Sequence, residues 1–324
     1  MLKRYSEEDG DLEVLKDKII AVIGYGSQGE AQANCFKDSG LNVIVGLRKG
    51  ESWEKAEKEG HNVMSVSDAV ENASIIHVLI PDEVQGEVYN NSIRSYLTKG
   101  KTLSFSHGFS ITYGIIKPPE DVNVIMVAPM GPGPEVRSSY QAGSGIASLI
   151  AIKQDAEDGL RIALALAKGC GLLKKGCLEC SFEQETIQDL FSEQAVLCGG
   201  MVELIKMAFN TLVENGYPEE LAYFCLHESN LITKLLTKHG IEGMYGKVSN
   251  TAEYGGRKVG KFLINDKVRG NMEKVLNNVK NGDFVKDFLD DYDAGFEKLK
   301  LLREKSKSES IEKVGKDLRK FINK

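Results

Sequence analysis

Apolar residues form short continuous runs in the first half of the chain and recur at helical spacing in the second half. The runs of the first half lie at 19–23, 41–47, 74–80, 103–106, 124–128 and 146–152. Runs of this length, bounded by glycine, proline or polar residues, are typical of strands buried on both faces of a parallel sheet. The intervening segments at 30–37, 53–60 and 67–72 have helical character. This alternation predicts an α/β fold with a doubly wound parallel sheet.

The pattern changes after Ala156, where apolar residues recur at i, i+3, i+4 and i+7. That period is typical of amphipathic helices. We expect helices at 186–215, 218–239, 267–281 and 284–303, and a solvated surface helix at 304–324, where Lys alternates with Glu and Asp. A chain of 324 residues also exceeds what one core commonly fills. We therefore predict two domains, an α/β domain at 1–182 and an all-α domain at 183–324.

The first apolar run ends in three glycines spaced G-x-G-x-x-G, in the segment Gly24-Tyr25-Gly26-Ser27-Gln28-Gly29. In a strand–turn–helix unit the first glycine permits a tight turn, the second lets a pyrophosphate approach the backbone, and the third lets the helix pack closely on the strand. The N-terminus of that helix offers N–H groups to an anion. Because a strand precedes the motif and helical residues follow it, we predict a Rossmann-type dinucleotide-binding domain.

Composition and charge limit the kinds of partner that we expect for the chain. A formal net charge of −6 argues against nucleic acid or an anionic membrane as the main partner. No apolar run approaches the roughly 20 residues that span a bilayer, and the polar first residues are not a signal peptide. The six cysteines do not form a disulfide-type array, and the C-x-x-C at Cys177 and Cys180 has no second ligand pair for zinc. We expect a cytoplasmic protein with reduced, structural cysteines.

A histidine follows the fourth strand, because the run at 103–106 leads into His107-Gly108-Phe109. Ligands of doubly wound folds bind at the carboxyl edge of the sheet, so we expect His107 to be the catalytic histidine. The other histidines, at 61, 77, 227 and 239, are expected to be packed or solvated. The run at 124–128 reaches the same edge and ends in the Pro/Gly-rich loop 129–134, which is either a rigid turn or a wall for a nicotinamide ring.

Two carboxylates lie four residues apart in an otherwise apolar helical segment. Asp189 and Glu193 therefore share one helix face. Like charges on an apolar face are costly unless a cation compensates them, and carboxylate oxygens are the ligands that magnesium prefers. A solvated acidic face explains the spacing equally well. The sequence leaves both interpretations open.

Together these segments resemble the signature blocks of ketol-acid reductoisomerase in its short, class I form. The blocks are the glycine-rich motif, Pro81-Asp82-Glu83-Val84-Gln85, the His107 segment, the segment 189–200, and Ser249-Asn250-Thr251-Ala252-Glu253-Tyr254-Gly255. They occur in the family's order and span nearly the whole chain. The resemblance implies an enzyme of valine and isoleucine biosynthesis. It would convert 2-acetolactate or 2-aceto-2-hydroxybutyrate to a 2,3-dihydroxy-3-methyl acid by magnesium-dependent alkyl migration and hydride transfer from NAD(P)H.

The resemblance also implies roles for individual residues. His107 would be catalytic, Ser249 would contact substrate, and Asp189, Glu193 and Glu228 would bind two magnesium ions. The implied cofactor contacts are Gly24, Tyr25, Gly26, Ser27, Gln28, Gly29, Arg48, Glu51, Ser52, Asp82, Glu83, Val84, Gln85 and Gly133. In this family the helical domains interlock and complete the site across a dimer. A homodimer or larger homo-oligomer is therefore implied.

The chain departs from the family pattern at two places near the reaction centre. Where the family reads A-Y-F-E-C-L-H-E, this chain reads Ala-Tyr-Phe-Cys-Leu-His-Glu at 222–228, so that the first glutamate is missing while Glu228 remains. Where the family reads A-P-K-G-P-G-H, Met130 and Pro134 replace the lysine and the histidine. We expect both changes to weaken magnesium binding and charge stabilisation.

Cofactor choice rests on the loop after the second strand. Arg48 can stack on adenine or hold a 2′-phosphate, whereas the carboxylate of Glu51 favours free ribose hydroxyls. Lys49 and Ser52 favour the phosphate, so NADP(H) is slightly preferred over NAD(H). Two other functions remain open at this point. One is a 2-keto acid reductase that has lost the isomerase step, and the other is a non-catalytic, cofactor-binding paralogue that associates with an active homologue.

Overall fold

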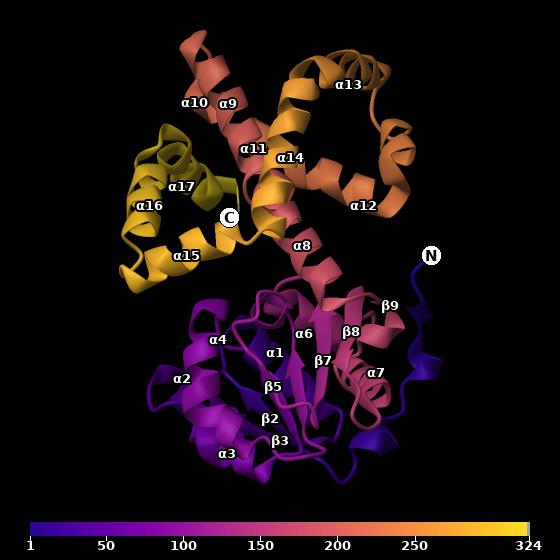
Figure 1. Ribbon diagram of the computed structural model, residues 1–324. Helices are drawn as coiled ribbons and strands as arrows, with labels where there is room; N and C mark the ends of the chain where they lie inside the picture. Colours follow the sequence, from indigo (N-terminus) through magenta and orange to yellow (C-terminus); the bar gives the residue numbers. More distant parts are fainter. Residues whose placement is uncertain (323–324) are drawn as a thin grey trace. The chain divides into compact units, whose positions relative to one another are not determined.

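The computed structural model describes residues 1–322, which divide into two compact units, the first at 1–188 and the second from Asp189 onward (Figure 1). The first unit contains the sheet, and the second is built from helices. The boundary between them falls inside one helix, α8 (Phe182–Ser192), which begins in the first unit. The predicted fold class, an α/β domain followed by an all-α domain, is confirmed.

The sheet of the first unit has nine strands in the order β1-β9-β8-β7-β6-β5-β2-β3-β4. The strands are β1 (Arg4–Tyr5), β2 (Ile19–Ile23), β3 (Asn42–Gly46), β4 (Asn62–Met64), β5 (Ile75–Val78), β6 (Thr102–Phe105), β7 (Asn123–Pro129), β8 (Ser148–Gln154) and β9 (Cys177–Glu179). Strands β2 to β7 pair in parallel, with Ile23 opposite Val78 and Val78 opposite Phe105. The carboxyl ends of β2, β5 and β6 therefore share one edge.

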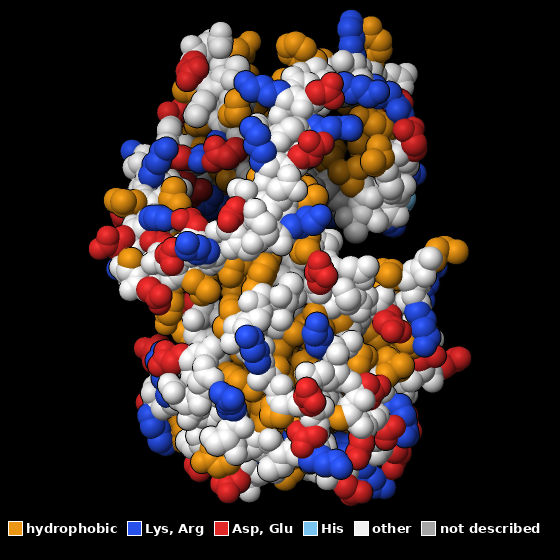
Figure 2. All heavy atoms as spheres, viewed as in Figure 1, with side chains coloured by type: hydrophobic (Ala, Val, Ile, Leu, Met, Phe, Trp, Pro, Cys, Tyr) orange, Lys and Arg blue, Asp and Glu red, His pale blue; other side chains and the backbone are white. Residues whose placement is uncertain are grey.

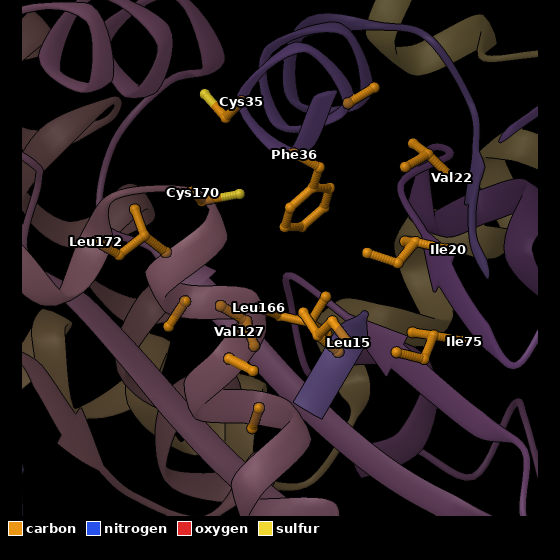
Figure 3. Close-up of a cluster of buried hydrophobic side chains, with 14 of the residues drawn as sticks. Leu15, Ile20, Val22, Cys35, Phe36, Ile75, Val127, Leu166, Cys170 and Leu172 are labelled. Atoms are coloured by element: carbon orange, nitrogen blue, oxygen red, sulfur yellow. The ribbon is translucent and has the colours of Figure 1, made fainter. Parts of the chain in front are cut away.

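Helices cover both faces of the sheet. They are α1 (Ser27–Asp38), α2 (Glu51–Lys58), α3 (Val66–Asn72), α4 (Asp82–Val88), α5 (Phe109–Thr112), α6 (Gly133–Gln141) and α7 (Gly159–Gly169). Alternate residues of β2 point to opposite faces, since Ile20 and Val22 join one buried cluster and Ala21 and Ile23 join the other. Figure 3 shows the first cluster, in which Phe36 of α1 lies among Leu166 of α7 and the strand residues.

The direction of β8 differs from the parallel arrangement that the sequence predicts. β8 runs antiparallel to β7, with Ser148 opposite Pro129 and Gln154 opposite Val124. After α6 the chain re-enters the sheet at the edge where β7 ended, so β8 runs back along it. The short strands β1 and β9 also pair antiparallel, and both lack an apolar run that would predict them. A buried apolar run carries no information on strand direction, which is why the sequence missed this feature.

The second unit is all-helical and has a small core. Its helices after α8 are α9 (Gly200–Glu214), α10 (Glu219–Ala222), α11 (Phe224–His227), α12 (Ser229–Tyr245), α13 (Asn250–Leu263), α14 (Asp266–Lys280), α15 (Asp283–Asp293), α16 (Glu297–Ser308) and α17 (Ser310–Ile322). Phe209, Ala222, Tyr223 and Ile311 form its buried cluster. Large apolar side chains such as Tyr254 and Phe262 remain exposed. Figure 2 shows hydrophobic side chains at the surface within the curve of α12 and α13.

One helical stretch, Phe182–Glu214, is long and apolar enough to cross a membrane by length and composition. The sequence predicted no apolar run of about 20 residues, and polar residues such as Gln194 and Glu203 interrupt this stretch although it meets the length and composition test. The stretch reaches 33 residues because α8, a π-helical turn at Glu193–Leu197 and α9 follow one another without a break. Only 6% of its most apolar window is buried. A single helix of this kind is weak evidence for a membrane span, because an apolar helix that packs against a protein partner has the same composition.

Candidate active site

The glycine-rich loop after β2 has the backbone geometry that its sequence predicts. Gly24 has φ +104°, a value that L side chains rarely adopt, and a Cβ there would lie 2.8 Å from the Leu79 carbonyl oxygen. A Cβ on Gly29 would collide with the carbonyl of Gly24. Around Gly26 there is open space within 4 Å. Gly24 and Gly29 are thus required by the fold, whereas Gly26 leaves room beside the N-terminus of α1 for a ligand.

The side chains of the glycine-rich motif form hydrogen bonds with other segments of the same unit. Tyr25 is buried, and its hydroxyl donates to Oε2 of Glu59 at 2.6 Å, at the end of α2. Burial raises the pKa of that hydroxyl. Gln28 donates through Nε2 to the Gly131 carbonyl at 2.8 Å, and Ser27 Oγ accepts from the Gly133 N–H at 3.2 Å. The motif therefore offers a cofactor its backbone N–H groups more than its side chains.

Gly133 lies against this loop. A Cβ at that position would collide with the Ser27 carbonyl, so α6 can begin there only with glycine. The neighbouring Met130 and Pro134, where the resemblance leads one to expect lysine and histidine, are both exposed. The loop that follows β7 is thereby held close to the N-terminus of α1.

The loop after β3 carries the residues expected to distinguish the two dinucleotides. Arg48, Lys49, Glu51 and Ser52 are all exposed. The ammonium of Lys49 lies 3.4 Å from the ring centroid of Trp53. Glu51 opens α2, and Gly50 before it has φ +151°. This exposed turn therefore carries two cations, which favour the 2′-phosphate of NADP(H), and one carboxylate, which favours the free ribose hydroxyls of NAD(H).

The segment Asp82–Gln85 forms the first turn of α4. Asp82, Glu83 and Val84 are half-buried, whereas Gln85 is buried. The amide of Gln85 donates to the Ile80 carbonyl and to Oδ1 of Asp82, both at 3.0 Å, and accepts from Ser110 Oγ at 2.7 Å. Gln85 thus fastens α4 to α5, the helix that follows His107.

His107 follows β6 and is paired with a residue that the sequence reasoning missed. Its Nδ1 lies 2.9 Å from Oε1 of Glu185 on α8, and the Gly108 N–H donates to Oε2 of the same carboxylate at 2.8 Å. Glu185 is 3% exposed. A carboxylate that receives the Nδ1 proton fixes the imidazole tautomer and leaves the Nε2 lone pair for other partners. The signal was available, because Glu185 stands one helical turn before Asp189.

Within the described part of the chain, one compact group of potential metal ligands comprises His107, Glu185 and Asp189, whose ligand atoms lie within 4.8 Å of one another. The remaining expected ligands are not in this group. Glu193 is exposed at the start of the π-helical turn, and Glu228 is exposed between α11 and α12. Ser249, the expected substrate contact, is the exposed N-cap of α13 and accepts from the Ala252 N–H.

The missing glutamate leaves no gap in the backbone. α10, α11 and α12 follow one another, and the residues between them, Tyr223 and Glu228, keep helical φ and ψ. The Leu226 N–H bonds to the Tyr223 carbonyl, a tighter i to i+3 contact. Phe224, four residues before Glu228, is exposed, and Cys225 is half-buried. The oxygen donors that remain suit magnesium, but fewer of them are present than the family pattern provides.

Two family models match the chain. Residues 14–176 match the model described as acetohydroxy acid isomeroreductase, NADPH-binding domain, and residues 182–324 match ketol-acid reductoisomerase, C-terminal domain. The chain is 54% identical over 324 residues to the ketol-acid reductoisomerase (NADP(+)) of Methanocaldococcus jannaschii, covering 99% of this chain and 98% of the relative. It is 49% identical over 324 residues to the ketol-acid reductoisomerase (NAD(+)) of the uncultured archaeon GZfos26G2, covering 98% of each. The solved structure of an NADH-preferring ketol-acid reductoisomerase from an uncultured archaeon aligns with TM-score 0.95 and 48% identity, over 98% of this chain and 99% of that one.

Proposed function

The chain belongs to the ketol-acid reductoisomerase family, and from that premise we propose how its residues carry out the reaction. It is an oxidoreductase of valine and isoleucine biosynthesis that converts 2-acetolactate or 2-aceto-2-hydroxybutyrate to a 2,3-dihydroxy-3-methyl acid. The observation that carries the proposal is the meeting of three segments at one edge of the sheet: the glycine-rich loop, the segment 82–85, and His107 paired with the buried Glu185.

We assign the dinucleotide to the glycine-rich loop, the turn 48–52, residues 82–85 and Gly133. The space beside Gly26 and the N-terminus of α1 support a pyrophosphate there. NADPH is the proposed cofactor in preference to NADH, because Arg48 and Lys49 bring two cations to the turn against the one carboxylate of Glu51. Both preferences occur among the relatives, so the choice rests on these side chains.

We propose that Asp189 and Glu193 hold magnesium together with Glu228 of a second copy of the chain. Their hard carboxylate oxygens fit that ion. Bound magnesium would polarise the substrate ketone and stabilise the neighbouring alkoxide during alkyl migration. The chain's own part is separate from the ion. Glu185 holds the His107 ring in one tautomer, so that Nε2 can accept a proton at the carboxyl edge, and Ser249 offers a hydroxyl to the substrate.

The exposed apolar face of α9 and the preceding turn supports a homodimer. Val196, Leu197, Met201, Val202, Leu204 and Met207 are exposed there, with Met207 67% exposed. A contiguous apolar face of this kind is typical of a protein interface. A second copy of the chain would cover it and bring Glu228 to the site. We also propose that the enzyme acts on small-molecule substrates in the cytoplasm.

Purified protein with magnesium, NADPH and 2-acetolactate tests the proposed function. We expect NADPH oxidation followed at its absorbance band and product with the rearranged carbon skeleton by NMR. The same assay with 3-hydroxy-3-methyl-2-oxobutanoate bypasses the alkyl migration. Because one carboxylate and one lysine are missing, we expect this second substrate to be turned over faster than acetolactate. Absence of turnover with both substrates and both dinucleotides would refute the proposal.

A further inference from the structure

The interior of the dinucleotide-binding unit contains a chain of buried polar side chains that no step of the reaction uses. His77 on β5, Gln32 on α1 and Ser104 on β6 are all 0% exposed and lie in the apolar layer between the sheet and α1. We call His77, Gln32, Ser104, Ser106 and Gln28 the interior network. The rings of Phe36 and His77 form a T-shaped pair with centroids 5.8 Å apart. Polar groups in such a place are costly unless each is hydrogen-bonded.

The donor and acceptor of each hydrogen bond in the network can be assigned, starting from the Gly131 backbone carbonyl. The Gly131 carbonyl oxygen can only accept a hydrogen bond. Gln28 therefore presents Nε2 to it at 2.8 Å and turns Oε1 toward Gln32. Gln32 must then donate through Nε2, which lies 3.0 Å from Gln28 Oε1 and 3.0 Å from Ser106 Oγ. The remaining oxygen of Gln32 faces His77.

The same reasoning fixes the histidine tautomer. His77 Nε2 lies 2.8 Å from Gln32 Oε1, so Nε2 carries the proton. Nδ1 therefore accepts from Ser104 Oγ, 2.9 Å away. Ser106 Oγ receives its bond from Gln32 and donates to the Val127 carbonyl at 2.9 Å. A flip of the Gln28 amide would face its oxygen to the Gly131 carbonyl, and a flip of the Gln32 amide would face its NH₂ to the His77 Nε2–H.

The two ends of the network lie at the proposed cofactor edge. One end is the Gly131 carbonyl, in the loop between β7 and α6, and Gly133, the first residue of α6, donates its N–H to Ser27 Oγ. The other end is Ser106, the residue directly before His107. The network thus connects the N-terminal half of α1, the end of β6 and the loop after β7, three segments that would have to keep their spacing around a nicotinamide.

We propose that His77 is a positioning residue whose Nε2 proton orders Gln32 and Gln28, and thereby holds the loop 130–133 at the N-terminus of α1 in the conformation that binds the dinucleotide. Without that proton Gln32 Oε1 keeps only the weak thiol donor Cys170, whose Sγ lies 4.0 Å away, so the amide orientation that presents Nε2 to Gln28 is less strongly favoured. An apolar residue at this site would avoid the desolvation of an imidazole but would not fix the loop. The proposal rests on the proposed function, because it assumes that this loop and α1 hold the cofactor.

The experiment compares His77→Phe and His77→Gln with the wild type, using NADPH fluorescence for the Kd and initial rates for KM and kcat. Phe supplies an aromatic ring, larger than imidazole, without either nitrogen, and Gln retains a donor. We expect His77→Phe to raise the Kd and the KM for NADPH about tenfold with kcat within about twofold, and His77→Gln to restore most of the affinity. The matched control is Ile76→Val, the neighbouring residue of β5, which points to the opposite face of the sheet. It should lower stability and leave the KM unchanged.

Further measurements distinguish failure of the proposed function from failure of the positioning role of His77. Wild-type protein that binds neither dinucleotide would refute the proposed function. Wild-type binding with an unaltered KM in a folded His77→Phe variant would overturn the positioning role alone. If His77→Phe does not fold, Ser104→Ala and the ¹⁵N spectrum of histidine-labelled wild-type protein decide the matter. An Nδ1 resonance typical of an unprotonated imidazole nitrogen supports the network, and a protonated Nδ1 contradicts it.

Discussion

At the scale of single residues, we expect Glu185 to affect the reaction rate most directly, through His107. Two donors bond the Glu185 carboxylate at short distance, His107 Nδ1 to Oε1 and the Gly108 N–H to Oε2, and the Thr186 hydroxyl lies 3.3 Å from Oε2. We expect Glu185→Gln to lower kcat/KM by roughly a hundredfold, because the amide presents a donor to one of these two donors and releases the ring. Steady-state rates with acetolactate measure the effect. Glu183→Gln, on the exposed side of the same helix, is the matched control and should behave like the wild type. Equal rates for both variants would remove Glu185 from the site.

Cofactor preference is also decided by single side chains. Arg48 is exposed and free of the aromatic contact that holds Lys49 on Trp53. We expect Arg48→Ala to lower kcat/KM for NADPH about tenfold, with little change for NADH, because a charge-assisted bond to the 2′-phosphate is lost. Glu51→Gln should act in the opposite direction and favour NADPH. A parallel loss with both dinucleotides in Arg48→Ala would assign Arg48 to adenine stacking instead.

Burial of His77 has a consequence for stability as a function of pH. Burial lowers the pKa of this imidazole from 6.5 to about 4. The unfolded chain therefore binds the proton first, and the stability that the neutral ring contributes is present above about pH 6.5 and is lost as the pH falls toward 4. The full difference corresponds to roughly 3 kcal/mol. Urea unfolding at pH 7.5 and pH 4.5 should show this extra loss in the wild type and not in His77→Phe. Identical pH slopes would contradict it.

At the scale of elements, some features follow from local pattern and others do not. The strand β2, the glycine-rich turn and α1 are encoded within twenty consecutive residues, and the sequence predicted all three. The antiparallel β8 is set by where the chain returns after α6, which local apolar pattern does not record. Asp189 was identified because its spacing to Glu193 is local, whereas Glu185 acts through His107, 78 residues away along the chain. The interior network was equally hidden, since His77 has the appearance of an isolated histidine in an apolar run.

The helical segment α10–α12 shows how an element absorbs a deletion. Tighter turns at Tyr223 and Glu228 keep Tyr223 in the core, where Arg319 donates to its hydroxyl at 3.0 Å. We expect the cost of the deletion to fall on the proposed metal site. We expect insertion of Glu between Phe224 and Cys225 to tighten magnesium binding about tenfold or more by calorimetry, and to raise the isomerase rate, because a second carboxylate then precedes Glu228 by one turn.

The matched control for this insertion places Gln at the same position. It changes the helix register by the same amount and adds no charge, so it should leave magnesium affinity at the wild-type value. Should both insertions tighten binding equally, register rather than the lost carboxylate would limit the enzyme. Unfolding of both variants would instead make Cys225→Glu the informative substitution, since it adds the charge without moving Tyr223.

At the scale of the whole molecule, the exposed apolar residues of the helical unit are the basis of the proposed homodimer. Leu204 and Met207 are 47% and 67% exposed on α9. We expect the wild type to sediment as a dimer or larger oligomer, and Leu204→Asp combined with Met207→Asp to dissociate it, because two buried charges cannot be accommodated in an apolar interface. Leu301→Asp on α16, a residue of the same unit that is 73% exposed, is the control and should leave the mass unchanged. A monomeric wild type would refute the homodimer.

A second experiment asks whether the active site is shared between copies. If Asp189 of one chain and Glu228 of its partner bind the same magnesium, then Asp189→Asn and Glu228→Gln are each inactive alone. Unfolded and refolded together, they form mixed dimers in which one site has both wild-type carboxylates and the other has neither. With random pairing, half of the dimers are mixed and half of their sites are intact, so about a quarter of the wild-type activity should return. Carboxylates that act within one chain cannot be restored in this way, because every site then keeps one substitution. The recovered fraction therefore measures whether the two carboxylates of one site come from one chain or from two.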